Sequence, residues 1–377
     1  MNLIKGIARK IVKKVEERNS KLGQGRSIGL IGFVDKDGYI SSHGGMVDGG
    51  LSGVPFRKLL STVVDKTEGP LLNLINQLPD NAVYISTAPG KTGIIINTAG
   101  INIFDLPIIK IGIKNNKAVA AGIIYPEKKL FELASYSEKM QLKNLAANTM
   151  EEEREALREL SKLRLKYIEI SGEVPFVDRE LSYIKPSTVL QSKKEIETAR
   201  GLKKTFAEKL VAKSNEIEQG REVAAIGIIN DKGCIEQAGE VVVGGMGYVP
   251  SRLLASGFKD ITGISLRKSY TNIIPENSVI VHTHPGGTGV MHMGDAMAGP
   301  GTWGRSIVAI GHDRDGNIKG ATIIDYSQEM GELIDEYEEL DQLFFQAETQ
   351  VEEAKIRKKR YQIAQDFTDL CRSLEIS

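Results

Sequence analysis

The sequence predicts an α/β protein with two tandem domains, each a curved mixed sheet flanked by helices, and with added long helices. Short apolar runs that read as strands alternate with amphipathic helical segments, as expected for a sheet covered by helices. Turn sequences such as DKDG, NDKG and DRDG accompany these runs and are typical of hairpins. The third observation is an internal repeat, which predicts a duplicated domain.

The repeat becomes visible when the chain is placed over itself. Residues 25–59 overlay residues 220–254 at a shift of 195 without a gap, and 14 of the 35 positions are identical. Residues 78–93 overlay residues 274–289 at a shift of 196. Solenoid repeats have much shorter periods, so the sequence indicates two copies of one domain.

The basic, amphipathic N-terminus belongs to this repeated unit. Its helical run at 6–22 falls on a second helical run at 201–217. Such a segment can lie on a membrane surface or act in targeting, but this one contains acidic residues and lacks an apolar core region. We therefore expect it to be the first helix of its own domain.

Each copy is expected to run helix, strand, turn, strand, glycine-rich bend, helix, strand, loop, strand, strand. The strands are predicted from apolar runs such as IGLIGFV, AVYIS, AAIGII, SVIVH and SIVAIG. The glycine-rich segments GGMVDGGLSG and GGMGYVP match no phosphate-binding loop, so we interpret them as bends or substrate-edge loops.

These patterns divide the chain into four parts. We expect a first domain at 1–125, a helical and proline-punctuated linker at 126–195, a second domain at 196–326 and a C-terminal helical extension at 327–377. The charged long helices either pack on their own domains or form a hairpin or coiled coil that joins subunits or partners. A homo-oligomer or a larger complex would form through these helices.

Composition narrows the class of protein. The 377 residues carry 49 Lys and Arg against 49 Asp and Glu, and this balance does not favour a nucleic-acid partner. No apolar run is as long as a membrane helix requires. Cys234 and Cys371 are far apart and form no CxxC motif, which argues against disulfides and against a four-thiolate zinc site. We expect a cytoplasmic protein with no membrane and no nucleic-acid partner.

Three of the five histidines lie in one stretch, SVIVHTHPGGTGVMHMGD, at residues 278–295. Residues two apart in a strand point to the same face, so His282 and His284 are expected to project together. A glycine-rich loop after the strand turns the chain back and lets Asp295 approach as a third ligand. Two imidazoles, one carboxylate and one open position describe a catalytic zinc site. The alternative is two strand histidines and a loop aspartate that hold no metal.

The His-Thr-His-Pro motif at 282–285, with Asp295 ten residues after the proline, resembles the core of the JAMM/MPN metalloprotease family. The pattern of that family is Glu … His-(Ser/Thr)-His-Pro … Ser-x-x-Asp. The resemblance covers residues 200–325 closely and reaches the first half only through the internal repeat. It implies two tandem MPN/JAMM-like domains, of which one bears the motif and one is degenerate.

The resemblance also implies roles for two further residues. Glu222, in GREVAAIGII, occupies the place of the family glutamate and becomes the general base, while Glu240 is a rival in the mid-domain turn region. His292 stands where the family has a serine that helps to hold the oxyanion. His292 can donate a hydrogen bond there, act as an extra ligand, or be an exposed loop imidazole.

The function implied by the resemblance is hydrolysis of an amide bond with Zn²⁺ as cofactor. The favoured substrate is a protein: a peptide or isopeptide, such as a conjugate of a ubiquitin-like or sulfur-carrier protein. Two alternatives stay open. One is a non-catalytic scaffold that keeps its metal, and the other is a metal-dependent hydrolase of a non-peptide substrate, since a fold does not determine its chemistry.

The first copy is expected to be metal-free. The internal alignment pairs the four site residues of the second copy with residues that cannot bind zinc: Ser27, Ser86, Ala88 and Ala99. The framework around them is the same in both copies, namely Thr87, Pro89, Gly90, Thr92 and Gly93. The contrast supports the site assignment, because the differing residues are those that metal chemistry requires.

The remaining histidines and the methionines near the motif receive structural interpretations. We expect His43 to be a turn or surface residue and His312 to lie in the hairpin turn GHDRDG. Met291, Met293 and Met297 could bind a soft metal, but packing around the loop is the favoured interpretation.

Overall fold

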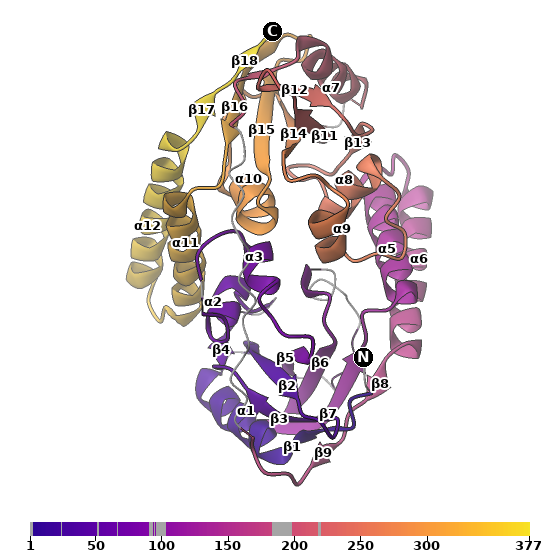
Figure 1. Ribbon diagram of the computed structural model, residues 1–377, viewed down its shortest axis with the longest axis vertical. Helices are drawn as coiled ribbons and strands as arrows, with labels where there is room; N and C mark the ends of the chain where they lie inside the picture. The colour runs from indigo at the N-terminus through magenta and orange to yellow at the C-terminus, as the bar shows by residue number, and fades with distance from the viewer. Residues whose placement is uncertain are drawn as a thin grey trace.

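The protein contains two curled mixed sheets at its two ends, with helices on their faces and along both flanks (Figure 1). The computed structural model describes residues 3–23, 25–50, 53–65, 67–89, 93, 95, 103–182, 198–217 and 220–377. The predicted α/β class, with curled mixed sheets flanked by helices, is confirmed.

The first sheet has nine strands among the described residues, in the order β8-β7-β6-β5-β2-β3-β1-β9 with β4 paired to β2. The strands are β1 (Gly6–Ala8), β2 (Ile28–Val34), β3 (Tyr39–His43), β4 (Val47–Asp48), β5 (Ala82–Pro89), β6 (Ile108–Lys114), β7 (Lys117–Ile124), β8 (Gly172–Glu173) and β9 (Phe176–Val177).

The second sheet repeats this order strand by strand, as β17-β16-β15-β14-β11-β12-β10-β18 with β13 paired to β11 among the described residues. Its strands are β10 (Gly201–Leu202), β11 (Val223–Ile229), β12 (Cys234–Gln237), β13 (Val242–Val243), β14 (Ser278–Pro285), β15 (Ser306–His312), β16 (Ile318–Ile324), β17 (Arg372–Ser373) and β18 (Glu375–Ile376). The repeat in the sequence therefore corresponds to a repeat in strand order.

The helices of the two halves also correspond. In the first half they are α1 (Arg9–Leu22), α2 (Phe56–Ser61), α3 (Leu71–Ile75), α5 (Lys128–Leu145) and α6 (Met150–Glu169). In the second half the corresponding helices are α7 (Lys204–Ile217), α8 (Ser251–Phe258), α9 (Leu266–Asn272), α11 (Gln328–Gln346) and α12 (Gln350–Asp369). Two further elements, α10 (Met293–Ala296) and the π-helix η1 (Met297–Trp303), lie between α9 and α11 and have no counterpart among the described helices of the first half.

The first element of each copy differs from the prediction. The run at 6–22 was expected to be helical throughout, but residues 6–8 form β1, which pairs in parallel with β3 and β9. At 201–217 the chain likewise forms β10 before α7 begins. A strand of two or three residues is too short to show period-two alternation, so only its pairing partners define it.

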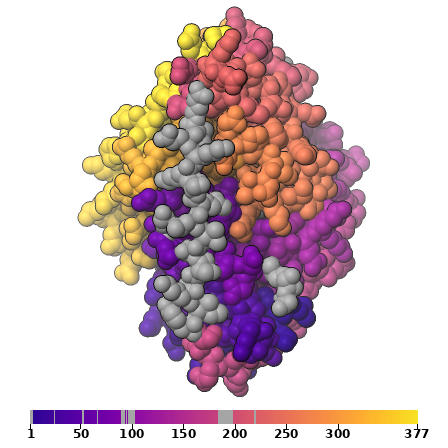
Figure 2. Space-filling view, viewed as in Figure 1, coloured from indigo at the N-terminus to yellow at the C-terminus, as the bar shows by residue number. Residues whose placement is uncertain are grey.

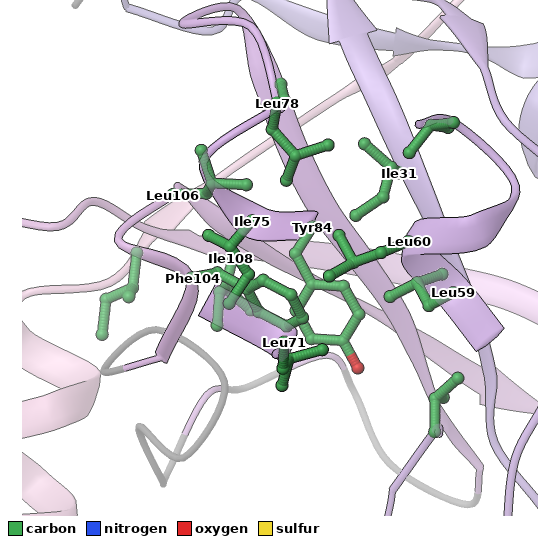
Figure 3. Close-up of a cluster of buried hydrophobic side chains, with 14 of the residues drawn as sticks. Ile31, Leu59, Leu60, Leu71, Ile75, Leu78, Tyr84, Phe104, Leu106 and Ile108 are labelled. Carbon is green, nitrogen blue, oxygen red and sulfur yellow. The ribbon is translucent and has the colours of Figure 1, made fainter. Parts of the chain in front are cut away.

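Alternating strand residues place a hydrophobic core on each face of each sheet. In the first sheet, Leu30 packs among residues that α1 covers, while Ile31 faces the opposite cluster. Figure 3 shows that second cluster, where the rings of Tyr84 and Phe104 pack with centroids 5.2 Å apart among aliphatic side chains. In the second sheet Ala225 and Ile226 likewise belong to the core clusters on opposite faces.

Each long helical pair is an antiparallel hairpin that returns to its own sheet. The second helices of the two hairpins begin with matching capping boxes, at Thr149 with Glu152 and at Thr349 with Glu352. After the first hairpin, β8 pairs with β7 and β9 pairs with β1. After the second, β17 pairs with β16 and β18 with β10. The segments expected as linker and extension are thus helical, and each also supplies two strands to a sheet.

The hairpins also join the two halves. Arg57 on α2 forms an ion pair with Asp335 on α11, with Nε and Oδ1 2.6 Å apart. Correspondingly, Arg252 on α8 donates a hydrogen bond from NH1 to Ser135 Oγ on α5 at 3.3 Å. In the space-filling view the yellow α11 and α12 hairpin lies beside the second half, and its end reaches the first half (Figure 2). Each hairpin therefore packs on its own half and on the other half.

Candidate metal centre

Strand β14 places two histidines side by side in a buried position. His282 is 2 % exposed and His284 is 7 % exposed. Both residues pair with β15, and His282 also pairs with Ala224 of β11, so the strand is held on both sides where the rings project. The two Nε2 atoms lie 2.8 Å apart. The expectation that the rings project together agrees with this geometry.

The loop after β14 folds back over the sheet and brings Asp295 to the histidines. Its Oδ1 lies 3.4 Å from Nε2 of His282, and its Oδ2 lies 3.5 Å from Nε2 of His284. The fold-back requires Gly289, whose φ is +80°, and Gly311, where a Cβ would lie 2.0 Å from the Gly289 nitrogen. This close approach explains why a glycine-rich loop follows the motif.

Glu222 lies just before β11 and is buried, at 6 % exposure. Its N–H donates to the carbonyl of Gly245 at 2.9 Å, and its carbonyl accepts from the N–H of Gly244 at 2.8 Å. One donor atom from each of Glu222, His282 and His284 lies within 4.8 Å of the others. Glu240, the rival glutamate, is exposed and belongs to neither group of metal-binding side chains among the described residues.

The electrostatics of the cluster are those of carboxylates around imidazole. Burial raises the pKa of Glu222, and His282 opposes this effect. Burial would lower the pKa of His282, but hydrogen bonding and attraction to Asp295, with attraction to Glu222, raise it overall. Burial would raise the pKa of Asp295, but its hydrogen bonds to His282 and His284 hold this pKa well below the usual range of an aspartate. The cluster thus places two acidic side chains beside two imidazoles, an arrangement that a bound cation would stabilise.

The donor set fits a transition-metal ion. In tetrahedral zinc sites, bonds of 2.0–2.2 Å imply that neighbouring donor atoms lie about 3.4 Å apart. The two distances from Asp295 to the histidine nitrogens, 3.4 and 3.5 Å, match this value. The 2.8 Å between His282 and His284 is shorter, and a small rotation of either ring would open it. Imidazole and carboxylate ligands suit zinc and its neighbours in the transition series.

His292 lies at the exposed side of the cluster. Its ring stacks on that of His284, with centroids 4.8 Å apart and an interplanar angle of 18°. Its backbone N–H donates to Oδ2 of Asp295 at 2.9 Å, which ties the start of α10 to the carboxylate. A second group of potential ligands consists of one donor atom each from His284, His292 and Asp295, all within 4.8 Å of one another.

The first half has no such group among the residues that the structure describes. Ser27 and Ser86 occupy the positions of Glu222 and His282, and the Ser27 hydroxyl donates to the carbonyl of Gly50 at 2.7 Å. Ala88 has no ligand atom. The remaining positions of that comparison, Gly90, Thr92 and Ala99, lie outside the described residues.

The structure corrects one histidine prediction. His312, expected in a hairpin turn, is the last residue of β15 and is 2 % exposed. Its Nε2 lies 3.0 Å from the Ser214 hydroxyl on α7. The reason is that parallel pairing with Pro285 extends β15 by one residue, so the turn begins after His312. His43 ends β3 and is half-buried, next to the turn.

The methionines of the loop pack as expected. Met291 is 2 % exposed and Met293 is 8 % exposed, and both belong to the core cluster on one face of the second sheet, with Met297 packed against it. Both cysteines are free thiols, in agreement with the absence of a predicted disulfide.

Two supporting residues were not predicted. Thr283 faces away from the metal cluster, and its Oγ1 accepts a hydrogen bond of 3.1 Å from the N–H of Val223, next to Glu222. Thr87 does the same for Ile28 in the first half, at 2.8 Å. Arg221 holds the loop below Glu222 by donating from Nε to the carbonyl of Gly244 at 2.8 Å. Both residues are identical in the two copies, Thr283 with Thr87 and Arg221 with Arg26, and this identity could have indicated their structural role.

The first half contributes to the surroundings of Glu222. A Cβ on Gly245 would lie 3.1 Å from Cδ1 of Leu145, the last residue of α5. Since Gly245 accepts the backbone hydrogen bond of Glu222, the hairpin of the first half supports the loop that positions this glutamate. Sequence patterns contain no signal for this contact.

The chain was compared with family models, curated proteins and solved structures, and none of the three comparisons finds a match. Across the described residues, no helix combines the length and the apolar character needed to cross a membrane. The described side chains do include groups close enough together to hold a metal ion.

Proposed function

We propose that the protein is a metal-dependent hydrolase that cleaves a peptide or isopeptide bond at the cluster of Glu222, His282, His284 and Asp295. The observation that carries the proposal is a buried glutamate beside two histidine nitrogens that share one aspartate. A site that only stores a metal has no need of a carboxylate outside the ligand set.

His282, His284 and Asp295 would hold a zinc ion and leave one position open. When bound, such an ion polarises a carbonyl and lowers the pKa of a coordinated water molecule to about 7. The carboxylate of Glu222 accepts a proton from the attacking water and passes it to the nitrogen of the leaving amine. Burial of Glu222 keeps bulk water from competing for that proton.

The substrate class follows from the resemblance to the JAMM/MPN family. Conjugates of ubiquitin-like or sulfur-carrier proteins present a flexible tail that can reach a buried centre. Met246 and Tyr248, which follow Gly245 in sequence, and Val290, two residues before His292, are exposed apolar side chains that such a tail would contact.

Metal analysis combined with turnover tests this proposal. We expect about one zinc per chain in the wild type and a loss of metal in His282→Ala. Ser86→Ala, at the corresponding position of the first half, is the matched control and should keep the metal. Glu222→Gln should keep the metal and reduce peptide hydrolysis by a factor of about 10²–10⁴. Unchanged turnover in Glu222→Gln would refute the mechanism.

A further inference from the structure

The position of His292 relative to the other ligands suggests more than one arrangement of the site. The two groups of potential ligands overlap in His284: one contains Glu222 and His282, and the other contains His292 and Asp295. Nε2 of His284 is the atom that faces both His282 and Asp295. A ring nitrogen has one lone pair for a metal, so two groups that both use Nε2 of His284 would hold one ion between them.

That ion would be held by His282, His284 and Asp295, once a small ring rotation opens the 2.8 Å between the two histidine nitrogens. Glu222 and His292 are the further potential ligands near these three residues. The ligand atoms of His284, His292 and Asp295 lie within 4.8 Å of one another, whereas ligands of a tetrahedral ion lie about 3.4 Å apart. The ring of His292 therefore has to move by at most about 1–2 Å, which is within the reach of a side-chain rotation.

The surroundings of His292 allow the side chain to rotate while its backbone stays in place. Met291 and Met293, on either side of it, are buried in the core, and its N–H is hydrogen-bonded to Asp295. Its ring is exposed and stacks on the ring of His284. Rotation of this exposed ring gives up that stacking and leaves Met291 and Met293 in the core.

We propose that His292 is a displaceable fourth ligand, which closes the metal site when no substrate is bound. The inference rests on the proposed metal-dependent function. In the closed state the ion has three imidazoles and one carboxylate, a set that favours zinc or cobalt over magnesium or calcium. Substrate or water takes the fourth position when the neutral imidazole leaves, so the exchange changes no oxidation state and transfers no proton.

Cobalt(II) substitution tests the inference without measuring activity. We expect chelator competition to show that His292→Ser lowers Co²⁺ affinity at least tenfold, and that the visible spectrum changes in intensity as a nitrogen ligand is lost. His292→Cys should regain affinity and show a thiolate-to-cobalt charge-transfer band, because that band requires a bond from position 292 to the ion. His43→Ser, a histidine far from the cluster in sequence and in the other half, is the control and should bind Co²⁺ like the wild type.

The outcomes separate this inference from the proposed function. If His292→Ser binds Co²⁺ with wild-type affinity and spectrum, and His292→Cys shows no charge-transfer band, His292 is not a ligand and the proposed hydrolase is unaffected. If the wild type itself binds no metal, both proposals are wrong. Thermal melting of the metal-free proteins checks that the variants fold, and since the ring is exposed we expect unchanged melting temperatures.

Discussion

Glu138 on α5 lies at the joint between the two halves, and replacing it with glutamine should stabilise the protein at high pH only. Burial raises the pKa of Glu138 to about 7, and attraction to Arg252 of the other half opposes this effect. Its ordinary value is 4.5. Between these values the folded protein keeps a proton that the unfolded chain has lost.

The sign of the effect follows from proton binding. Because the unfolded chain binds fewer protons than the folded protein between pH 4.5 and 7, the contribution of Glu138 to the free energy of unfolding falls as the pH rises through this range. The difference between the two pKa values corresponds to at most about 3 kcal/mol. We expect about 2 kcal/mol, since the side chain is partly exposed and screened.

Urea denaturation at pH 4, 6 and 8 measures this contribution. Glu138→Gln should unfold like the wild type at pH 4 and be about 2 kcal/mol more stable at pH 8. Glu338→Gln on α11 should behave alike, because burial raises the pKa of Glu338 to about 7 as well. Glu132→Gln, an exposed position on α5, is the control and should change stability by less than about 0.5 kcal/mol. If Glu138→Gln were no more stable than the wild type at pH 8, the statement that burial between the two halves raises the pKa of Glu138 would be refuted.

Three further predictions concern the support of the metal centre. Thr283→Val removes the acceptor for the buried N–H of Val223, so it should lower the free energy of unfolding by about 1–3 kcal/mol and weaken zinc binding in a titration. Thr87→Val, the control in the first half, should lower the free energy of unfolding by a similar amount and leave zinc affinity unchanged. A chelator should lower the melting temperature of the wild type by several degrees, since zinc at 100 times its Kd adds about 2.7 kcal/mol to the free energy of unfolding. Calorimetry should show no such shift for His284→Ala. Leu145→Ala removes the side chain that packs against Gly245, so peptide turnover should fall while zinc content stays at the wild-type level. A loss of zinc would instead mean that the α5 and α6 hairpin positions the metal ligands, and not Glu222.

The sequence predicted most of the fold because the repeat duplicates its own signals. Turn sequences and apolar runs occur at matching positions in both copies, and the structure has matching strands there. The pairing of His282 with His284 could be predicted from strand periodicity alone. The approach of Asp295 to these histidines could not be predicted in the same way. It depends on the fold-back of the glycine-rich loop onto β15, which the spacing between His284 and Asp295 in the sequence permits but does not determine. The burial of His312 was missed because one extra parallel pair decides whether a residue ends a strand or begins a turn.

Contacts between the halves could not be predicted from the sequence. They indicate how the first half, which shows no group of metal-binding side chains among its described residues, contributes to the candidate site. The contacts are reciprocal: Leu145 lies against Gly245, and at the corresponding position Phe345 lies 2.8 Å from where a Cβ on Gly50 would be. Each half therefore supports the loop of the other half, although only one of these loops carries a glutamate. The first half has Ser27 at the position of Glu222, and its hairpin is present all the same. Both halves therefore support the loop at Glu222, and cutting the chain between them would remove a support of the proposed general base.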